Sequence, residues 1–252
     1  MSILDSFDDR TEALISPSDF APPIPGFPAV AVVCFTERER EIFLSEYPAE
    51  PITQMLSGDV VTVYQTQYRD QPIAFYRSQV GGAATAALMD AMIAKGCKRF
   101  VFFGACGALD AAIAPHQLIV PTAAYRDEGA SYHYAPASDW MEVKTADRLC
   151  ALLEGLHVPY LRSKVWTTDA IFRETRGVAE RRKQAGCLTV EMECASLMAA
   201  SQFRGIEAYQ FLHAADCLDG ASWDARTLGS MPDGARSRIL RVAMEVGARL
   251  AD

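Results

Sequence analysis

The sequence predicts an α/β fold in which a single domain has a mixed central β-sheet flanked by helices. Apolar runs typical of buried strands alternate with amphipathic segments of helical period along most of the chain. A predicted β-hairpin near residues 60–78 adds antiparallel pairing, so the sheet cannot be purely parallel. With 252 residues, half of them hydrophobic, the chain can bury one large core, and we assign this domain to residues 29–252.

The first part of the chain divides into an arm, a strand and a helix. Residues 1–28 are polar and then proline-rich, which predicts an extended arm on the body of the protein or on a neighbouring subunit. The apolar run 29–34 predicts a buried strand. Thr36 followed by Glu39 matches a capping box, so a helix is expected to start there and continue to about Tyr47.

The next stretch predicts a hairpin and a glycine-led helix. Residues 60–67 and 73–78 alternate in polarity, and residues 68–71 between them are typical of a turn. The glycines at 81 and 82 allow a backbone to approach a ligand closely. The small residues after them predict a helix to Lys95 with Gly96 as its C-cap.

Strands and helices continue to alternate to the end of the chain, and polar loops follow several strands. Loops at strand ends are where open α/β sheets bind ligands. The loop 125–134 is dense in functional side chains, and both a binding role and a simple solvated loop stay open. The remaining predicted strands are 99–103, 118–121, 160–166, 187–190 and 207–214, the helices 145–156, 176–185 and 236–250, and the other loops 104–107, 167–175 and 215–220.

Charge and composition exclude several function classes. The net charge of -8 argues against a broad nucleic-acid surface. The seven cysteines form no Cys-x-x-Cys pair and no metal-ligand spacing with the four histidines, so we expect reduced thiols and neither a metal nor a cofactor. The N-terminus lacks an apolar signal core and no segment approaches the length of a membrane span, which predicts a cytoplasmic protein without membrane contact.

Two acidic residues stand where a predicted strand passes into a helix, in the segment 189–198. Glu191 and Glu193 are two apart, so in an extended segment both face one cleft, with Met192 turned away. A carboxylate there can accept hydrogen bonds from two sugar hydroxyls, or stabilise the positive charge that develops as a glycosidic bond breaks. An acidic first turn that complements the helix dipole is the alternative, which position alone favours for Glu191.

Several segments together resemble the nucleoside phosphorylases and related nucleosidases, the group that acts on purine nucleosides, uridine and methylthioadenosine. Their order and spacing match this group from about residue 29 to the C-terminus. The segments are Val190-Glu-Met-Glu-Cys-Ala195, Gly104-Ala-Cys-Gly107, Val80-Gly-Gly82, Thr168-Asp169 and Ala215-Asp216.

The resemblance implies roles for individual residues. Glu193 binds the ribose hydroxyls, Met192 packs on the sugar, and Asp216 protonates the departing base, which contributes a factor of about 10²–10⁴. An acid at position 216 is typical of the purine-acting members, and the residues that read uracil are not evident after Phe172. We therefore expect a purine nucleoside as substrate. The further expected contacts to the substrate are Glu191, Val190, Cys106, Gly107, Phe172 as a stacking side chain, and Gly82.

The sequence departs from the group at the phosphate site. Phe102 and Ala105 stand where phosphorylases place an Arg and a Ser or Thr, and Cys34-Phe-Thr36 replaces a glycine-rich turn. A phosphate dianion needs several N–H or O–H donors and usually an arginine. The candidates that remain are Arg38, Arg77 and Thr85, together with the backbone N–H groups of 81–85 and 104–107.

Three functions follow from these observations. The first expectation is a nucleoside phosphorylase, in which inorganic phosphate is the co-substrate and ribose 1-phosphate and a free base are the products. The alternatives are a nucleosidase that uses water, with Glu191 or Glu193 as its base, and a nucleoside-binding protein with degraded catalysis. The expected partners are a small-molecule nucleoside and phosphate. The resemblance also implies a homo-oligomer, a dimer or a hexamer.

Overall fold

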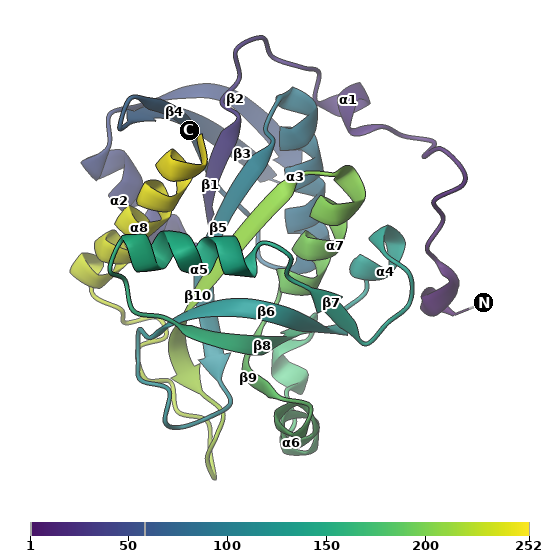
Figure 1. Cartoon of the computed structure of the whole chain (residues 1–252), viewed down its shortest axis with the longest axis vertical. Helices are drawn as coiled ribbons and strands as arrows, with labels where there is room; N and C mark the ends of the chain where they lie inside the picture. Colours follow the sequence, from purple (N-terminus) through teal and green to yellow (C-terminus); the bar gives the residue numbers. More distant parts are fainter. Residues whose placement is uncertain (1, 58, 252) are drawn as a thin grey trace.

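The computed structural model describes residues 2–57 and 59–251, and in this part of the chain ten strands form one continuous sheet (Figure 1). Five of them close into a ring, because each pairs with the next and the last pairs with the first. The ring runs through β5 (Arg99–Ala108), β10 (Glu207–Cys217), β6 (Leu118–Asp127), β8 (Leu161–Thr168) and β9 (Cys187–Glu191).

An open wing of the sheet extends from β5 on the other side. Parallel pairing joins β5 to β1 and β1 to β4, and antiparallel pairing continues the wing to β3 and β2. The short strand β7 (Trp140–Glu142) pairs with β6 outside this path. The wing strands are β1 (Val30–Cys34), β4 (Gln71–Arg77), β3 (Asp59–Tyr68) and β2 (Ala49–Ser57).

Helices cover the central strands from two sides. Figure 1 shows α2 (Glu37–Glu46) and α8 (Asp233–Ala251) on one side, and α3 (Gly82–Lys95) and α7 (Cys194–Arg204) on the other. Every residue of β1 is buried between them, and the core is continuous from this strand to α8. The remaining helices are α5 (Ala146–Gly155), α6 (Arg176–Gln184), the short α1 (Pro17–Phe20) and α4 (Ser131–Tyr134), and the 3-10 turns η1 (Ile3–Asp5) and η2 (Ile171–Arg173).

The predicted fold class, an α/β domain with a mixed central sheet, is confirmed. The Thr36 hydroxyl accepts the Glu39 N–H at the start of α2, and Gly96 ends α3 with a φ of 132°. The prediction of a loop at 104–107 is wrong, since β5 continues through these residues and pairs with β10 and β9. Glycine favours loops only weakly, and a ladder with two neighbouring strands outweighs that preference. The strands β2 and β7 were not predicted.

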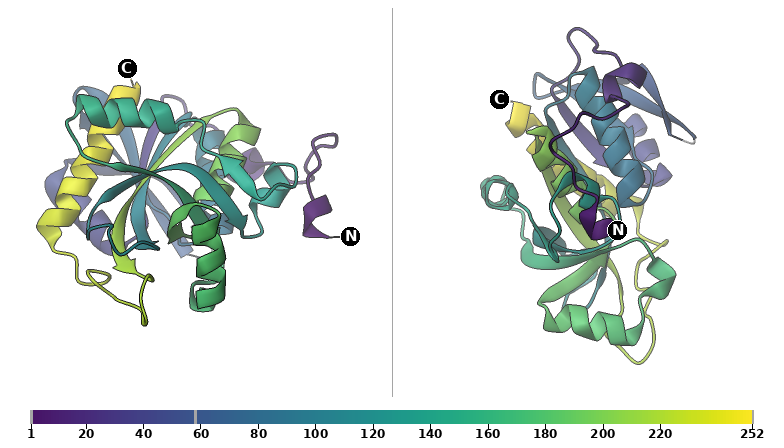
Figure 2. Two further views of the ribbon diagram at one scale, coloured as in Figure 1. Left: turned by 60° about the horizontal axis from the view of Figure 1, so that its bottom comes forward. Right: turned by 90° about the vertical axis from the view of Figure 1, so that its right-hand side faces the viewer.

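The segment 2–28 runs along the outside of the molecule in the second view of Figure 2. It is tied down at its C-terminal end, where the Ile24 N–H donates to the Lys95 carbonyl oxygen over 3.1 Å. Nearer the N-terminus, the Phe7 ring packs edge-on against the Phe203 ring. The segment therefore packs against the α3 and α7 side of the same chain.

Gly82, the first residue of α3, packs closely against α7. A Cβ added there would lie 2.2 Å from the Ser196 Oγ and 2.7 Å from its Cβ, and Ser196 is fully buried. Gly82 is thus needed for helix packing, and it does not contact the cavity described below. Its predicted role in substrate binding is wrong.

Replacing Gly82 by Ala is therefore expected to lower the free energy of unfolding by about 1–3 kcal/mol, because the two helices must separate. For a chain of this size, such a loss lowers Tm by about 2–12 °C. Circular dichroism during thermal unfolding measures it. Gly155→Ala is the matched control, since a Cβ on this glycine of α5 meets no atom within 4 Å. Equal Tm values for the two variants would contradict the packing argument.

Candidate active site

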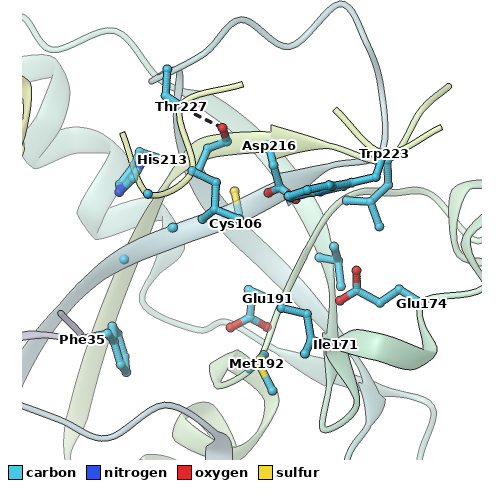
Figure 3. A pocket seen from close by; sticks show the side chains of 18 of the residues that line it. Phe35, Cys106, Ile171, Glu174, Glu191, Met192, His213, Asp216, Trp223 and Thr227 are labelled. Carbon is cyan, nitrogen blue, oxygen red and sulfur yellow. Dashed lines mark hydrogen bonds between the residues drawn. The ribbon is translucent and has the colours of Figure 1, made fainter. Parts of the chain in front are cut away.

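A cavity of about 1280 Å³ lies where the carboxyl ends of β1, β5, β9 and β10 meet. Cavities for drug-sized ligands have about 300–1,000 Å³, so this one has room for a nucleoside and a second small reactant. Figure 3 shows Asp216, Trp223 and Glu174 on one side of it and Phe35 on the opposite side, with Glu191 and Met192 between them. Residues of η2, of α6 and of the loop after β10 complete the wall.

Glu191, the last residue of β9, holds the start of α7. Its Oε1 accepts from the Thr167 hydroxyl over 2.5 Å, and its Oε2 accepts the backbone N–H groups of Glu193 and Cys194 over 2.8 and 2.7 Å. Burial raises the pKa of Glu191, and these hydrogen bonds oppose that rise. Both oxygens are occupied within the protein, which agrees with the helix-capping interpretation rather than with sugar binding.

Glu193 is the N-cap of α7 and lines the same cavity. Its Oε1 accepts the Gly81 N–H over 2.6 Å, and the backbone of Met192 also hydrogen-bonds to this carboxyl group. Burial, with the charge of Glu191 beside it, raises the pKa of Glu193 to about 8. Met192 also lines the cavity, so the expectation that it turns away is wrong. The strand ends at Glu191, so Met192 and Glu193 no longer alternate as in an extended segment, and the φ and ψ of Glu193 are -133° and -29°.

Asp216 enters the cavity from a β-bulge near the end of β10. The register with β5 shifts between Ala214 and Asp216, which places Asp216 opposite Gly107. Its Oδ2 accepts the Trp223 indole N–H over 2.7 Å. Burial raises the pKa of Asp216 and the indole N–H opposes the rise. A half-buried carboxyl group with a raised pKa is suited to donate a proton.

The residues expected beside a base line the cavity next to Asp216. Gly107 has no space for a side chain, since an added Cβ would lie 2.6 Å from Leu218 and 3.0 Å from Val190. Cys106 and Val190 are buried in the wall, and burial raises the pKa of the Cys106 thiol. Phe172 lines the cavity with 96% of its surface exposed, so its ring is free to stack on a ligand.

The predicted phosphate ligands are not brought together. Arg38 lines the cavity, but its guanidinium donates to Asp233 and Glu41. Arg77 lies outside the lining and pairs with Glu37 over 3.2 Å. Thr85 is fully buried, and its hydroxyl lies 2.9 Å from the Gln79 carbonyl oxygen. The predictions of Arg77 and Thr85 as phosphate ligands are therefore wrong.

Aromatic rings occupy this part of the wall instead, one just after β1 and one within β5. Phe35 packs so closely on Gly104 that a Cβ there would lie 2.9 Å from its ring, and the ring stacks on Phe102 at 6.4 Å. The basic side chains of the cavity wall are each bound within the described protein. Besides Arg38, Arg176 donates to two carbonyl oxygens, Lys183 donates to Asp219, and Arg236 donates to Glu39.

The sequence of residues 29–246 matches the family described as the Phosphorylase superfamily. The chain belongs to this superfamily. A uridine phosphorylase of Thermococcus kodakarensis is 28% identical over 159 residues, 56% of this chain. The match spans 57% of that relative's length, less than two thirds of it.

Two solved structures share the fold of this chain. One is a uridine phosphorylase from Vibrio fischeri, with a TM-score of 0.74 at 18% identity, covering 89% of this chain and 93% of that one. The other is an AMP nucleosidase from Bacteroides thetaiotaomicron, with a TM-score of 0.68 at 18% identity, covering 89% and 90%. The resemblance to nucleoside phosphorylases and nucleosidases is thereby confirmed at the level of the family.

Three cavity residues of this superfamily member were missed in the sequence. Glu174 follows η2, Trp223 lies in the loop after β10, and His213 lies within β10. Burial lowers the pKa of His213 to about 4, so this imidazole is neutral. An acid two residues after Phe172 and a tryptophan seven residues after Asp216 were the available signals for the first two.

The part of the chain that the structure describes holds neither a cluster of metal-ligating side chains nor a membrane-spanning helix. Residues 2–57 and 59–251 contain no group of three or more histidine, cysteine or acidic side chains placed to hold a metal ion. In the same residues, no helix combines the length and the apolar character that crossing a membrane requires.

Proposed function

We propose that the chain cleaves the N-glycosidic bond of a purine nucleoside, with Asp216 protonating the departing base and Glu193 holding the sugar. The observation that supports this most is that the carboxyl groups of Asp216 and Glu193 both line one cavity. A nucleobase leaves poorly as an anion, so a proton donor at its ring nitrogen lowers the barrier.

The steps follow from the positions of these side chains. The base lies between Phe172, Cys106 and Gly107, where Asp216 reaches its ring nitrogen. The carboxyl group of Glu193 accepts hydrogen bonds from the sugar hydroxyls, which fixes the ring, and in its ionised form it stabilises the positive charge that develops at C1′. The nucleophile approaches C1′ from the side of the cavity that Phe35 lines.

We propose phosphate as the nucleophile, in keeping with the superfamily, with Arg38 as its cation. To bind phosphate, the Arg38 guanidinium would give up its hydrogen bonds to Asp233 or Glu41. Water is the second candidate, and a specific observation favours it. Phe35, Phe102 and Ala105 present no donor side chain where a phosphate dianion would have to be desolvated.

Base release measured with and without inorganic phosphate separates the two. Phosphorolysis predicts release from adenosine or inosine only when phosphate is present, with ribose 1-phosphate as the second product. Equal release in both conditions, with free ribose as product, assigns the reaction to water. Chromatography of the products measures the released base and identifies the sugar product. Nucleoside binding without any release would contradict the proposed cleavage itself.

A further inference from the structure

Trp223 is a cavity residue in direct contact with the proposed proton donor. Its indole N–H donates to the Asp216 Oδ2 over 2.7 Å, and Figure 3 shows its ring beside this carboxyl group. An indole N–H is a donor only, so Oδ2 is the acceptor in this contact. The contact therefore bears on which of the two Asp216 oxygens carries the proton.

The loop after β10 brings Trp223 to this position. Asp224, the next residue, pairs with Cys217 in an antiparallel bridge, with distances between amide nitrogen and carbonyl oxygen of 2.8 and 3.0 Å. Arg176 of α6 donates to two carbonyl oxygens of the same loop. The loop thus returns to the end of β10, where the indole meets a carboxyl group that lies seven residues earlier in the chain.

The other oxygen of Asp216 lies on the side of Gly107. A Cβ added to Gly107 would lie 3.2 Å from the Asp216 Oδ1, and Gly107 lines the cavity where the base is proposed to lie. A protonated carboxyl group donates from one oxygen and accepts on the other. Because the indole occupies Oδ2 as an acceptor, the proton belongs on Oδ1, next to the wall that the base contacts.

We propose that Trp223 is a positioning residue, which keeps the proton of Asp216 on the oxygen that faces the base and stabilises the carboxylate that forms when this proton leaves. The inference rests on the proposed function and deepens it by assigning the donor oxygen. The proton passes from Oδ1 to a ring nitrogen of the base, the electron pair of the N-glycosidic bond moves to the base, and the nucleophile bonds to C1′. Asp216 is left ionised, with the indole N–H on its Oδ2.

The charge of Asp216 depends on groups from several elements. The titratable and charged groups near it are Cys106 of β5, Glu174 between η2 and α6, and Asp224 and Arg226 of the loop after β10. Burial raises the pKa of Asp216 most, and the Trp223 N–H is the largest of the effects that oppose the rise, ahead of the Asp216 backbone N–H and Arg226. Without the indole N–H, Asp216 therefore stays protonated to a higher pH.

The test is Trp223→Phe, which removes the N–H and keeps an aromatic ring in the cavity wall. We expect kcat for adenosine and inosine to fall by about 3–30-fold with little change in KM, because water replaces part of a charged hydrogen bond at this exposed position. The fall in rate at high pH should move up by about 1 pH unit, since the pKa of Asp216 rises. Trp140→Phe is the matched control, the same exchange on β7 outside the cavity wall, and should leave rate and pH profile unchanged.

A purine nucleoside methylated at N7 separates this role from a general effect on the loop. Such a substrate needs no proton from the enzyme, so Trp223→Phe should cleave it at the wild-type rate. Equal losses on methylated and unmethylated nucleosides, or an unchanged pH profile with adenosine, would overturn the role of Trp223 and leave the cleavage in place. Absence of cleavage by the wild type would overturn the proposed function instead.

The indole signal of Trp223 in ¹H–¹⁵N NMR gives a readout that is independent of turnover. The chain has three tryptophans, and Trp223→Phe identifies the signal by removing it. This signal should shift as Asp216 ionises in the wild type and stay in place over the same pH range in Asp216→Asn. An indole signal that does not respond to the ionisation of Asp216 overturns the inference, whether or not nucleosides are cleaved.

Discussion

Replacing Glu193 by Gln is expected to lower kcat/KM for nucleoside cleavage by about 10²–10⁴-fold. Two hydrogen bonds from sugar hydroxyls to an ionised carboxylate contribute about 1.5–3 kcal/mol each, and most of this is lost in the variant above about pH 8, where Glu193 is ionised. The amide oxygen of Gln can still accept the Gly81 N–H, so the start of α7 keeps its contact. Initial rates over a range of nucleoside concentrations measure the effect.

The thermal stability of Glu193→Gln shows whether Glu193 serves the function or the fold. The folded protein holds the Glu193 proton more tightly than the ordinary pKa of 4.5 implies, because of burial and the charge of Glu191. The stability that the protonated group contributes is therefore complete below about pH 4.5 and is lost as the pH rises through about 8. Glu193→Gln lacks this loss, so it should unfold at a higher temperature than wild type at about pH 9.

Two results would contradict this role of Glu193. A Tm below that of wild type at both about pH 6 and about pH 9 would show that the residue supports the fold. An activity close to wild type would remove it from the sugar site. Because the variant differs from wild type by one charge and keeps the same shape, a general packing defect is a poor explanation for a loss of rate.

Asp216→Asn is expected to slow cleavage of adenosine and inosine by about 10²–10⁴-fold, the usual contribution of a proton donor. Asparagine keeps the shape of the side chain and cannot transfer a proton to the departing base. The wild-type rate should fall as the pH rises above the raised pKa of Asp216, and the variant should lose this dependence. Rate profiles against pH for both proteins measure the two effects.

The control for Asp216 is a substrate whose base leaves without protonation. An N7-methylated purine nucleoside already carries a positive charge on its base, so it needs no proton donor. Wild type and Asp216→Asn should cleave it at similar rates. An equal loss on methylated and unmethylated substrates would show instead that Asp216 positions the ligand or supports the loop through Trp223.

The type and order of most elements were predictable, because they depend on local pattern. Period-2 and period-3.6 runs identified the strands and helices, and the Thr36 cap is formed by residues three apart. Where the glycines of 104–107 suggested a loop, pairing with strands about 80 and 110 residues away along the chain decided otherwise. The local sequence pattern does not reveal strand partners that are so distant in the chain.

The site was predictable only where one residue type suits one chemical role. The family resemblance assigned Glu193 and Asp216 to one site, and in the structure both line one cavity, because Glu193 follows β9 and Asp216 lies near the end of β10, where the carboxyl ends of the two strands meet. Arg77 was misassigned because Glu37, its ion-pair partner, lies on a different element and nothing local reveals the pair. Glu174 was missed for a related reason, since its neighbour Asp216 comes close only after the ring of strands closes.

The bulge in β10 makes the position of the proposed proton donor depend on strand register. If the ladder continued without a bulge after Ala214, Ala215 would lie opposite Gly107, and Asp216 would move opposite Ala108, which is outside the cavity wall. The ladder upstream would be untouched, and the sheet would lose no strand. In a lineage built on this scaffold, a shift of register at this point would thus remove the proposed acid from the cavity while the architecture is inherited unchanged.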